Sequence, residues 1–383
     1  MTKVLVVCNA YPSDENIYQN GFIHRRVKSY QKKGFTVEVY YLKQTAHEEE
    51  EYNYHDVNVT MGNGTHYSQY IQAHREDYAS YLIHFINPLM YYPIIEYVTN
   101  PKLVIWIHGY EAEAWHRRWF NFLASVEELK AIVDKATGYY KEQLEFMNAL
   151  YKEQDVDITF IHVSQWFKDH IADVDGKFAP QNYEIIPNII DSRIFNFKQK
   201  QREGKLKILS IRPYASHKYA NDQIRDAILL LSKKTFFKEL EFHIYGEGKL
   251  YAELTAPLVP FDNVHLHNTF LHQREISSLH KAFDVFLCPT RLDSQGVSMC
   301  EAMSSGLAVV ATDISAIPEF VEHNVSGLLA KPESPESIAV QIERLYNEAE
   351  LLKNISYHAA LSIRRKASEE VVINKELKVI LGG

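Results

Sequence analysis

The chain has 383 residues, with 46% hydrophobic residues and a formal net charge of −8. This length predicts two or three domains with substantial cores, and the acidic balance gives no electrostatic case for a nucleic-acid partner. The apolar run after the first residue is too short for a signal peptide, and no segment approaches the ~18 apolar residues of a membrane-spanning helix, so we expect a cytoplasmic protein.

The first half of the chain alternates short apolar runs with helical patterns. This alternation is typical of parallel strands joined by crossover helices, which predicts an α/β domain. Between these elements, the acidic cluster at residues 48–51 is interpreted as a solvated loop. We expect strands at residues 4–7, 37–42, 79–85, 103–107 and 158–163, and helices at 22–33 and 126–152.

Two positions in this half could bind a ligand. Gly21 precedes the first amphipathic helix, where a glycine lets the backbone approach a phosphate or an acceptor; the alternative is an ordinary loop and helix start. His108 follows a predicted strand, and open α/β sheets bind ligands at the carboxyl ends of their strands. The alternative for His108 is a structural histidine.

Aromatic and basic residues are concentrated at Trp115, Trp119, Phe120 and Phe122, around the pair Arg117 and Arg118. One interpretation is an interfacial contact with a membrane, because such elements place rings and positive charges at the lipid surface. The other is a buried aromatic patch between this segment and its neighbours.

The second half repeats the α/β logic after a junction at residues 185–207. The polar end of that junction, 198–204, is expected to be a surface linker, so the domains are predicted as 1–195 and 196–366. The second domain is expected to have strands at 207–211, 241–245, 264–267, 285–288 and 307–311.

Two features of the second half are compatible with phosphate binding. Arg212 and Lys218 follow the end of a predicted strand, where two cations could neutralise a diphosphate. Read without the downstream loop, the two residues favour the alternative of ordinary surface charges. Gly246 lies in a strand-to-glycine-loop element, IYGEGKL, although a plain turn gives the same letters.

The most informative segment spans residues 289–332. Asp293 and Glu301 bracket a loop with Gly296, and a helix is predicted from near Ser298 to Gly306. A helix that opens on a glycine loop directs unpaired N–H groups and its positive dipole end at one point, which suits a phosphate. A carboxylate on the first turn could then accept hydrogen bonds from a ribose.

A purely structural interpretation of the same segment also exists. Ser298 and Glu301 have the spacing of a capping box, and Gly306 could simply be a C-terminal cap. The segment as a whole nevertheless resembles the signature of retaining GT-B-fold glycosyltransferases of the family 4 type (glycosyl transferases group 1). That signature is an acidic residue, seven spacers and a glutamate, followed here by EAMSSGLAVVAT and SGLLAKP.

The chain departs from this family at three places. Asp293 stands where the family usually has Glu, the loop reads Asp-Ser-Gln-Gly in place of Glu-Gly-Phe-Gly, and Tyr219 replaces a glycine. The resemblance implies an α/β GT-B fold, with two Rossmann-like domains facing across a cleft. It also implies that the last helix, about 367–383, packs back on the first domain.

The resemblance further implies a retaining glycosyltransferase of the hexosyltransferase class, with UDP as the favoured nucleotide. Glu301 would bind the ribose, Asp293 the sugar, Arg212 and Lys218 the diphosphate, and His108 the sugar from the first domain. No metal or other cofactor is expected, and Cys8, Cys288 and Cys300 lack metal-ligand spacing. The remaining implied donor contacts are Ser294, Gln295, Gly296, Val297, Gly246 and Gly21.

The acceptor stays open as a glycan, a lipid-linked or another acceptor, with a role in polysaccharide synthesis at the inner face of the membrane. Two alternatives remain. A nucleotide-sugar epimerase of the same fold would use the donor without an acceptor, and a non-catalytic subunit would only bind it.

Overall fold

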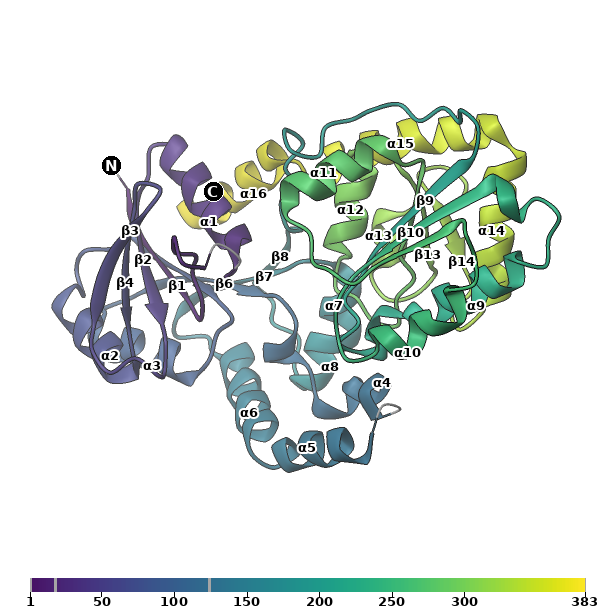
Figure 1. The fold of residues 1–383 in the computed structure, drawn as a ribbon. Coiled ribbons are helices and arrows are strands. Elements are labelled where there is room, and N and C mark those ends of the chain that lie inside the picture. Colours follow the sequence, from purple (N-terminus) through teal and green to yellow (C-terminus); the bar gives the residue numbers. More distant parts are fainter. Residues whose placement is uncertain (1, 17–18, 123–124, 383) are drawn as a thin grey trace. The chain divides into compact units, whose positions relative to one another are not determined.

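A computed structural model describes residues 2–16, 19–122 and 125–382 (Figure 1). The chain forms two compact units. Unit 1 comprises Met1–Trp115, Val133–Ile189 and Glu369–Gly383, and unit 2 comprises His116–Ile132 and Ile190–Ser368. The sequence predicted divisions after residues 195 and 366, whereas the contacts divide the chain after Ile189 and Ser368, and residues 116–132 belong to unit 2.

Unit 1 is built on one sheet with the strand order β3-β4-β2-β1-β5-β6-β7-β8. All neighbours are parallel except β3 and β4, which form an antiparallel pair at one edge. The strands are β1 (Lys3–Cys8), β2 (Thr36–Leu42), β3 (Glu50–Tyr54), β4 (Val57–Gly62), β5 (Ser80–His84), β6 (Lys102–Ile107), β7 (Asp157–His162) and β8 (Tyr183–Ile185).

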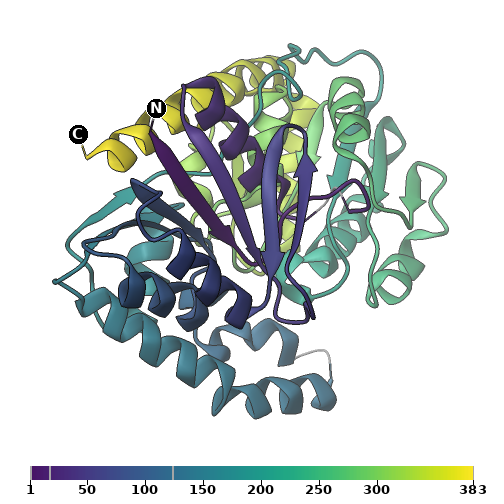
Figure 2. The ribbon, with the colours of Figure 1, turned by 90° about the vertical axis from the view of Figure 1, so that its left-hand side faces the viewer.

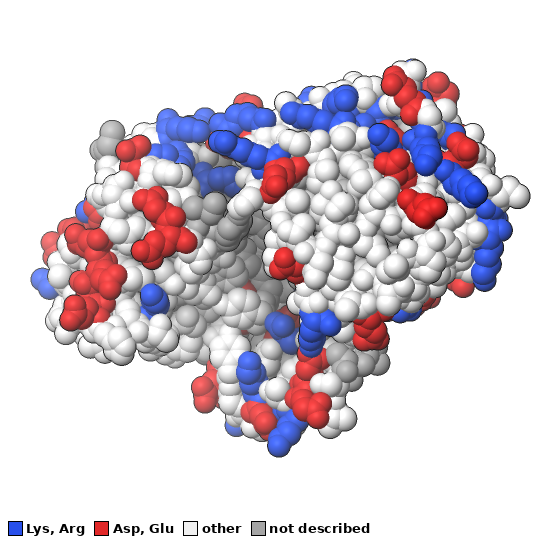
Figure 3. Space-filling model, viewed as in Figure 1, with Lys and Arg blue, Asp and Glu red and all other residues white. Residues whose placement is uncertain are grey.

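The β3–β4 pair corrects the expected solvated loop at residues 48–51, because Glu50 and Glu51 belong to β3. The strand was missed because its side chains are mostly polar and exposed, so it lacks the apolar run of a buried strand. Figure 3 shows acidic side chains over this edge of unit 1. Charge on an edge strand discourages pairing with another chain.

Helices cover both faces of the unit 1 sheet, with α1 and α16 on one face and α2 and α3 on the other (Figure 2). The predicted helix at 126–152 is interrupted before Tyr139, giving α5 and α6. The longer helices are α1 (Gly21–Lys32), α2 (Gly64–Ala73), α3 (Pro88–Tyr97), α5 (Val126–Ala136), which runs from unit 2 into unit 1, α6 (Tyr139–Lys152) and α16 (Glu369–Leu381); shorter ones are α4 (Trp119–Phe122), α7 (Gln165–Phe167) and α8 (Asp173–Asp175).

A buried polar cluster fixes α16 in unit 1. The Arg26 Nε atom lies 2.8 Å from Glu376 Oε1, and neither side chain is exposed. Tyr30 and Trp106 also donate to the Glu376 carboxylate, at 2.6 and 3.2 Å. The carboxylate therefore has several donors in the core, which offset the cost of removing it from water.

Unit 2 is a fully parallel sheet with the order β11-β10-β9-β12-β13-β14. Helices α9, α10 and α14 pack on one face, and α11, α12 and α15 lie on the other (Figure 1). The strands are β9 (Leu206–Ile211), β10 (Leu240–Tyr245), β11 (Val264–His267), β12 (Val285–Leu287), β13 (Ala308–Thr312) and β14 (Leu328–Ala330), and the helices are α9 (Asn221–Leu231), α10 (Tyr251–Thr255), α11 (Gln273–Ala282), α12 (Val297–Ser304), α13 (Ile317–Phe320), α14 (Pro335–Asn347) and α15 (Ala349–Ala367).

The expected surface linker at residues 198–204 is exposed at most of its positions, but Lys200, which is only 3% exposed, anchors it to unit 2. Its backbone N–H donates to Ser356 Oγ at 2.9 Å, and its Nζ donates to the His280 carbonyl at 2.5 Å. Burial lowers the pKa of Lys200 to about 8. The burial of Lys200 could not be predicted from the polar composition of residues 198–204, because the carbonyl that binds this lysine comes from a distant helix.

The cysteines Cys8, Cys288 and Cys300 are buried and free. Burial raises the pKa of Cys8 and of Cys288 to about 12, so both thiols stay protonated at neutral pH. Within the described ranges, none of the helices is long and apolar enough to cross a membrane.

Candidate functional site

The candidate residues of unit 2 follow three adjacent strands. Arg212 comes directly after β9, Gly246 directly after β10, and residues 289–296 follow the end of β12. Because β10, β9 and β12 are neighbours in a parallel sheet, their carboxyl ends share one edge. That edge is where open α/β sheets bind ligands.

Arg212 is buried, at 5% exposure, so the surface-charge alternative is wrong for this residue. Its guanidinium donates to the Pro289 carbonyl at 3.2 Å and to Ser298 Oγ at 3.4 Å, and it lies 5.1 Å from the centre of the Tyr219 ring. Its Nε is buried without a hydrogen-bond partner. Among the described residues, no carboxylate forms an ion pair with Arg212.

Tyr219 thus has a role where the family usually has glycine. Its ring covers the Arg212 guanidinium, a favourable cation–π contact that also excludes water from the charge. The neighbouring Lys218 is half-buried in the short 3-10 turn His217–Tyr219. The departure from the family pattern therefore shapes the surroundings of the first cation.

Sequence reasoning missed Arg291, which fixes the turn that carries Lys218. The Arg291 N–H donates to the Lys218 carbonyl at 2.9 Å, and its guanidinium donates to the His217 carbonyl at 2.6 Å. The same guanidinium forms ion pairs with Asp222 and Glu333, both at 2.7 Å. Arg291 has two carboxylate partners, whereas the equally buried Arg212 has none in the part of the chain that the structure describes.

Asp293 shapes the loop before α12. Its Oδ1 accepts hydrogen bonds from the N–H groups of Gln295 and Gly296, at 3.1 and 2.7 Å. Gly296 then adopts a φ of 75°, a left-handed conformation that favours glycine, and α12 begins at Val297. Ser294 and Gln295 therefore lie in a tight loop, with Gln295 buried.

The start of α12 rules out the capping-box interpretation. The N-cap residue is Gly296, which has no side chain to cap the helix, and Ser298 lies inside the first turn. Because α12 begins at Val297, Glu301 is its fifth residue and starts the second turn instead of ending the first; its side chain is half-buried. The interpretation of Gly306 as a C-terminal cap is confirmed, since it follows the helix with a φ of 87°.

The first turn of α12 has free donors. Within the described ranges, the backbone N–H groups of Val297, Ser298 and Met299 donate no hydrogen bond. These groups and the helix dipole give a positive potential at the helix start. The Arg212 guanidinium contacts Ser298 in that same first turn. Two sources of positive potential therefore meet at the start of α12, where the Asp293 carboxylate bonds only the preceding N–H groups of Gln295 and Gly296 among the described residues.

Gly246 has a packing reason to be glycine. A Cβ at this position would lie 2.0 Å from the Arg212 carbonyl oxygen, and a Cβ at Gly248 would lie 2.3 Å from the Tyr214 carbonyl carbon. The loop also bonds to the Arg212 segment, with the Tyr214 N–H donating to the Glu247 carbonyl at 2.8 Å. The two glycines of the G-x-G element are therefore required by the close approach of two loops at the candidate site.

His108 of unit 1 lies just after β6 and stacks on His84, whose Nδ1 is 2.9 Å from His108 Nε2. Burial, with a smaller contribution from Arg26, holds the pKa of His108 well below its usual range, so the imidazole is neutral. Glu111, which sequence reasoning missed, accepts hydrogen bonds from the N–H groups of His108 and Gly109. Burial raises the pKa of Glu111 to about 7.

Gly21 is the first residue of α1, and a Cβ added there would meet nothing within 4 Å. No packing constraint therefore requires glycine at this position.

In the segment considered for membrane contact, Phe120 is 3% exposed and Trp119 is 44% exposed. The segment thus combines a buried ring with an exposed one.

Part of unit 2 is similar in sequence to known glycosyltransferases. Residues 208–348 match the sequence model of glycosyl transferases group 1. The amylovoran biosynthesis glycosyltransferase AmsK of Erwinia amylovora is 32% identical over 165 residues, which are 41% of this chain and 40% of that protein. The matches span about a third to a half of the length of the first curated relatives.

Solved structures share the fold over nearly the whole chain. Sucrose-phosphate synthase from Thermosynechococcus elongatus superposes with a TM-score of 0.73 at 11% identity, covering 100% of this chain and 99% of that one. HepE from Anabaena, in complex with UDP and glucose, gives a TM-score of 0.67 at 14% identity and covers 100% of both chains. The two Rossmann-like sheets confirm the predicted GT-B fold class, and residues 208–348 are similar in sequence to glycosyl transferases group 1.

Proposed function

We propose that the protein transfers a sugar from a nucleoside diphosphate sugar, with UDP as the favoured nucleotide, to an acceptor with retention of configuration. The observation that carries this proposal is Arg212. A permanently charged, buried guanidinium with an unsatisfied Nε lies at the start of α12 without a carboxylate partner among the described residues. A buried charge of this kind is costly unless a ligand compensates it, and a diphosphate supplies the missing negative charge.

The remaining roles follow from position. Free N–H groups at the start of α12 would bind a phosphate, and Arg212 and Lys218 would offset the charge that develops on the leaving diphosphate. Glu301 would accept hydrogen bonds from the ribose. Asp293, with the backbone of residues 294–297, would position the sugar.

In this mechanism the acceptor hydroxyl attacks from the face that the leaving group occupies, and a leaving phosphate oxygen takes the acceptor proton. The neutral imidazole of His108 suits a contact with an uncharged sugar hydroxyl, and Gly21 leaves room for a substrate beside the start of α1. Two protein cations in place of a metal ion would make the transfer independent of divalent metals.

The nucleotide preference is supported by HepE, whose structure contains UDP and glucose. A role in polysaccharide synthesis is supported by AmsK, a glycosyltransferase of amylovoran biosynthesis. We further propose that Trp119, exposed beside Arg117 and Arg118, touches an anionic membrane surface while the protein acts on its acceptor. Co-sedimentation with anionic vesicles should then decrease in Trp119→Ser and at high salt.

Calorimetric titration with UDP tests the central proposal. Arg212→Gln should weaken UDP binding by roughly tenfold to a hundredfold, the range expected for losing hydrogen bonds to a charged group. Arg365→Gln is the matched control, because Arg365 is an exposed arginine on α15 of the same unit. Unchanged affinity in Arg212→Gln, or no binding of any nucleoside diphosphate by the wild type, would overturn the proposal.

Turnover separates the proposed transfer from the alternatives. Incubation with a panel of UDP-sugars should release UDP, with a product that keeps the anomeric configuration of the donor. An epimerised sugar formed without an acceptor would indicate an epimerase. Tight donor binding without turnover, under any acceptor tried, would indicate a binding subunit.

A further inference from the structure

Four ligand-type side chains gather on one face of the unit 2 sheet, beside its edge strand. Glu241 and His243 are two residues apart on β10, so they point to the same face. His265 lies directly opposite His243 in the parallel register, and His267 lies opposite Tyr245. The alternate residues of β10, Phe242 and Ile244, face the apolar core.

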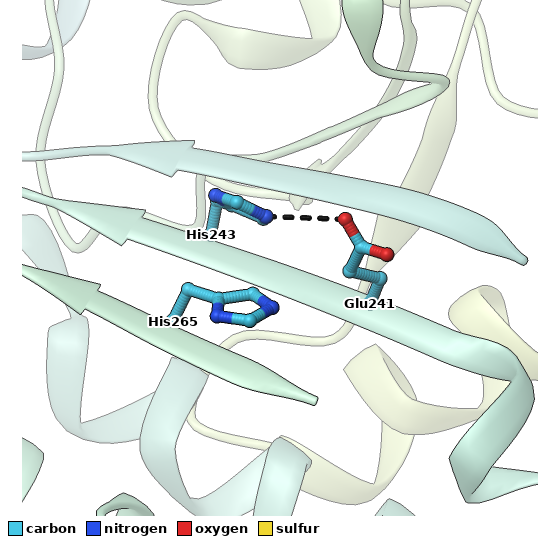
Figure 4. A group of neighbouring side chains, drawn as sticks. All are labelled: Glu241, His243 and His265. Atoms are coloured by element: carbon cyan, nitrogen blue, oxygen red, sulfur yellow. Dashed lines mark hydrogen bonds and ion pairs between the residues drawn. The ribbon is translucent and has the colours of Figure 1, made fainter. Parts of the chain in front are cut away.

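The donor atoms of Glu241, His243 and His265 all lie within 4.8 Å of one another (Figure 4). His243 Nε2 is 3.2 Å from Glu241 Oε1, and the His243 and His265 rings have centroids 4.4 Å apart. Zinc bonds to nitrogen and oxygen are ~2.0–2.2 Å long, so ligand atoms around one ion are separated by less than twice that length. Small side-chain rotations would bring the three groups to such distances.

His267 supplies the outer contact that metal-bound histidines usually have. Its Nε2 lies 3.3 Å from His243 Nδ1, the ring nitrogen that faces away from Glu241. The His267 ring also stacks on Tyr245, with centroids 4.1 Å apart. A partner at Nδ1 orients the imidazole and selects the tautomer that leaves Nε2 free for an ion.

Access and charge both permit a cation here. His265 is exposed on the edge strand, and Glu241 and His243 are partly exposed, so an ion could enter from solvent. The Glu241 carboxylate would offset part of the charge of a bound divalent ion. Imidazole donors select zinc, nickel, copper or cobalt over magnesium and calcium.

We propose that Glu241, His243 and His265 bind one divalent transition-metal ion of the zinc class and thereby fasten the edge strand β11 to β10. The strand is short, four residues, and pairs on one side only. A metal link across the pair would compensate for the missing neighbour. The site is separate from Arg212 and the start of α12, so the inference does not depend on the proposed function.

Zinc titration of the full-length protein, stripped with EDTA and exchanged into metal-free buffer, tests the inference. We expect one Zn²⁺ per chain and a rise in the melting temperature, because the ion binds the folded state. His243→Gln and His265→Ala should each weaken Zn²⁺ binding by at least ~10-fold, the loss that even outer contacts can cause. Mg²⁺ should have no effect.

His358→Ala is the matched control, since it removes an exposed histidine of unit 2 far along the sequence on α15. It should bind Zn²⁺ as the wild type does. His265 is exposed, so its replacement should leave the metal-free melting temperature unchanged, which shows that the variant folds. Visible absorption of bound Co²⁺ gives a second readout of nitrogen and oxygen ligation. Absence of stoichiometric Zn²⁺ binding, or equal binding in both ligand variants and the control, would overturn the inference.

Discussion

The two acidic residues of the signature have different surroundings, so their substitutions should have different effects on UDP binding and on sugar transfer. Glu301→Gln removes the negative charge of the carboxylate that we propose binds the ribose. It should weaken binding of UDP and of the donor by roughly tenfold or more. Asp293→Asn keeps an oxygen that can accept from the Gln295 and Gly296 N–H groups. It should therefore preserve UDP binding while transfer falls steeply, because the sugar is no longer oriented for attack.

Asp293→Ala is the control for this pair, because it removes both the charge and the acceptor of the loop N–H groups. We expect it to weaken UDP binding as well, since the loop leads directly into the first turn of α12. Calorimetry with UDP and a turnover assay with the donor measure the two effects. Full transfer by Asp293→Asn would restrict Asp293 to a structural role.

A buried histidine of unit 1 predicts a pH effect on stability. His162 has no exposed surface, and neither of its ring nitrogens has a hydrogen-bond partner among the described residues. Burial lowers its pKa from 6.5 to about 3. Between these values the unfolded chain binds more protons than the folded one, so the contribution of this group to stability is complete above pH 6.5 and is lost as the pH falls.

His162→Phe removes this titration. The slope of unfolding free energy against pH should become shallower below pH 6.5, with a difference of about 2 kcal/mol accumulated by about pH 5. Denaturant unfolding at several pH values measures it, and the slope is informative even if the larger ring costs stability at every pH. His358→Ala, which replaces an exposed histidine, should keep the wild-type slope. A wild-type slope in His162→Phe would contradict the prediction.

At the scale of elements, α16 depends on the buried Arg26–Glu376 pair. Among the described residues, Glu376→Ala would leave the Arg26 guanidinium in the core with neutral partners, the Phe22 carbonyl and the Asn188 side chain. We expect a loss of about 3–5 kcal/mol in the free energy of unfolding. Urea unfolding measures it, and Glu343→Ala, which breaks an exposed pair with Lys234, should cost less than about 1 kcal/mol. Similar losses in both variants would contradict this account.

Two glycines should behave in opposite ways. Gly246→Ala would push a Cβ against the Arg212 carbonyl oxygen at a φ of 153°, so we expect a destabilisation of about 1–3 kcal/mol and weaker UDP binding. Gly21→Ala meets no neighbour and should leave the melting temperature unchanged or higher. A fall in transfer by Gly21→Ala without loss of stability would support its place beside a substrate. Unchanged stability in Gly246→Ala would show that the loop can move away.

Elements with a strong local pattern could be predicted from the sequence. The buried strands β1, β2, β5, β6 and β7 each contain an apolar run, and their positions agree with the expected ranges. The edge strand β3 could not be recognised, because its residues are polar and its pairing depends on β4. The same reason hid the Glu241–His243–His265 cluster, whose members come together only through the register of β10 and β11.

The candidate site was predicted where one segment carries it and missed where distant segments meet. The loop and helix at residues 293–301 form one stretch of chain, so the site could be predicted from these consecutive residues alone. Arg291 was missed because its partners, Asp222 and Glu333, lie 69 and 42 residues away. The excursion at residues 116–132 belongs to unit 2 through contacts such as Asn121 with Ser216, which no local pattern reveals.

For the whole molecule, the proposed diphosphate site and the proposed metal site predict different responses to EDTA. Arg212 and Lys218 supply fixed positive charge to the diphosphate, so sugar transfer should persist in excess EDTA. The proposed Glu241–His243–His265 site would lose its ion, so the melting temperature should fall. In His265→Ala the melting temperature should not respond to EDTA at all.

Parallel turnover and thermal-unfolding assays, with and without EDTA, distinguish the outcomes. Transfer that is lost in EDTA and restored by Mg²⁺ would contradict the role of Arg212 and Lys218 as the replacement for a metal ion. Transfer that is lost in EDTA, restored only by Zn²⁺ and already absent in His265→Ala would show that the edge-strand site supports activity. If transfer persists in EDTA while the melting temperature falls, the chemistry depends on the Arg212 and Lys218 cations and the metal ion stabilises the edge of the sheet. Only the edge-strand site depends on an exchangeable ion.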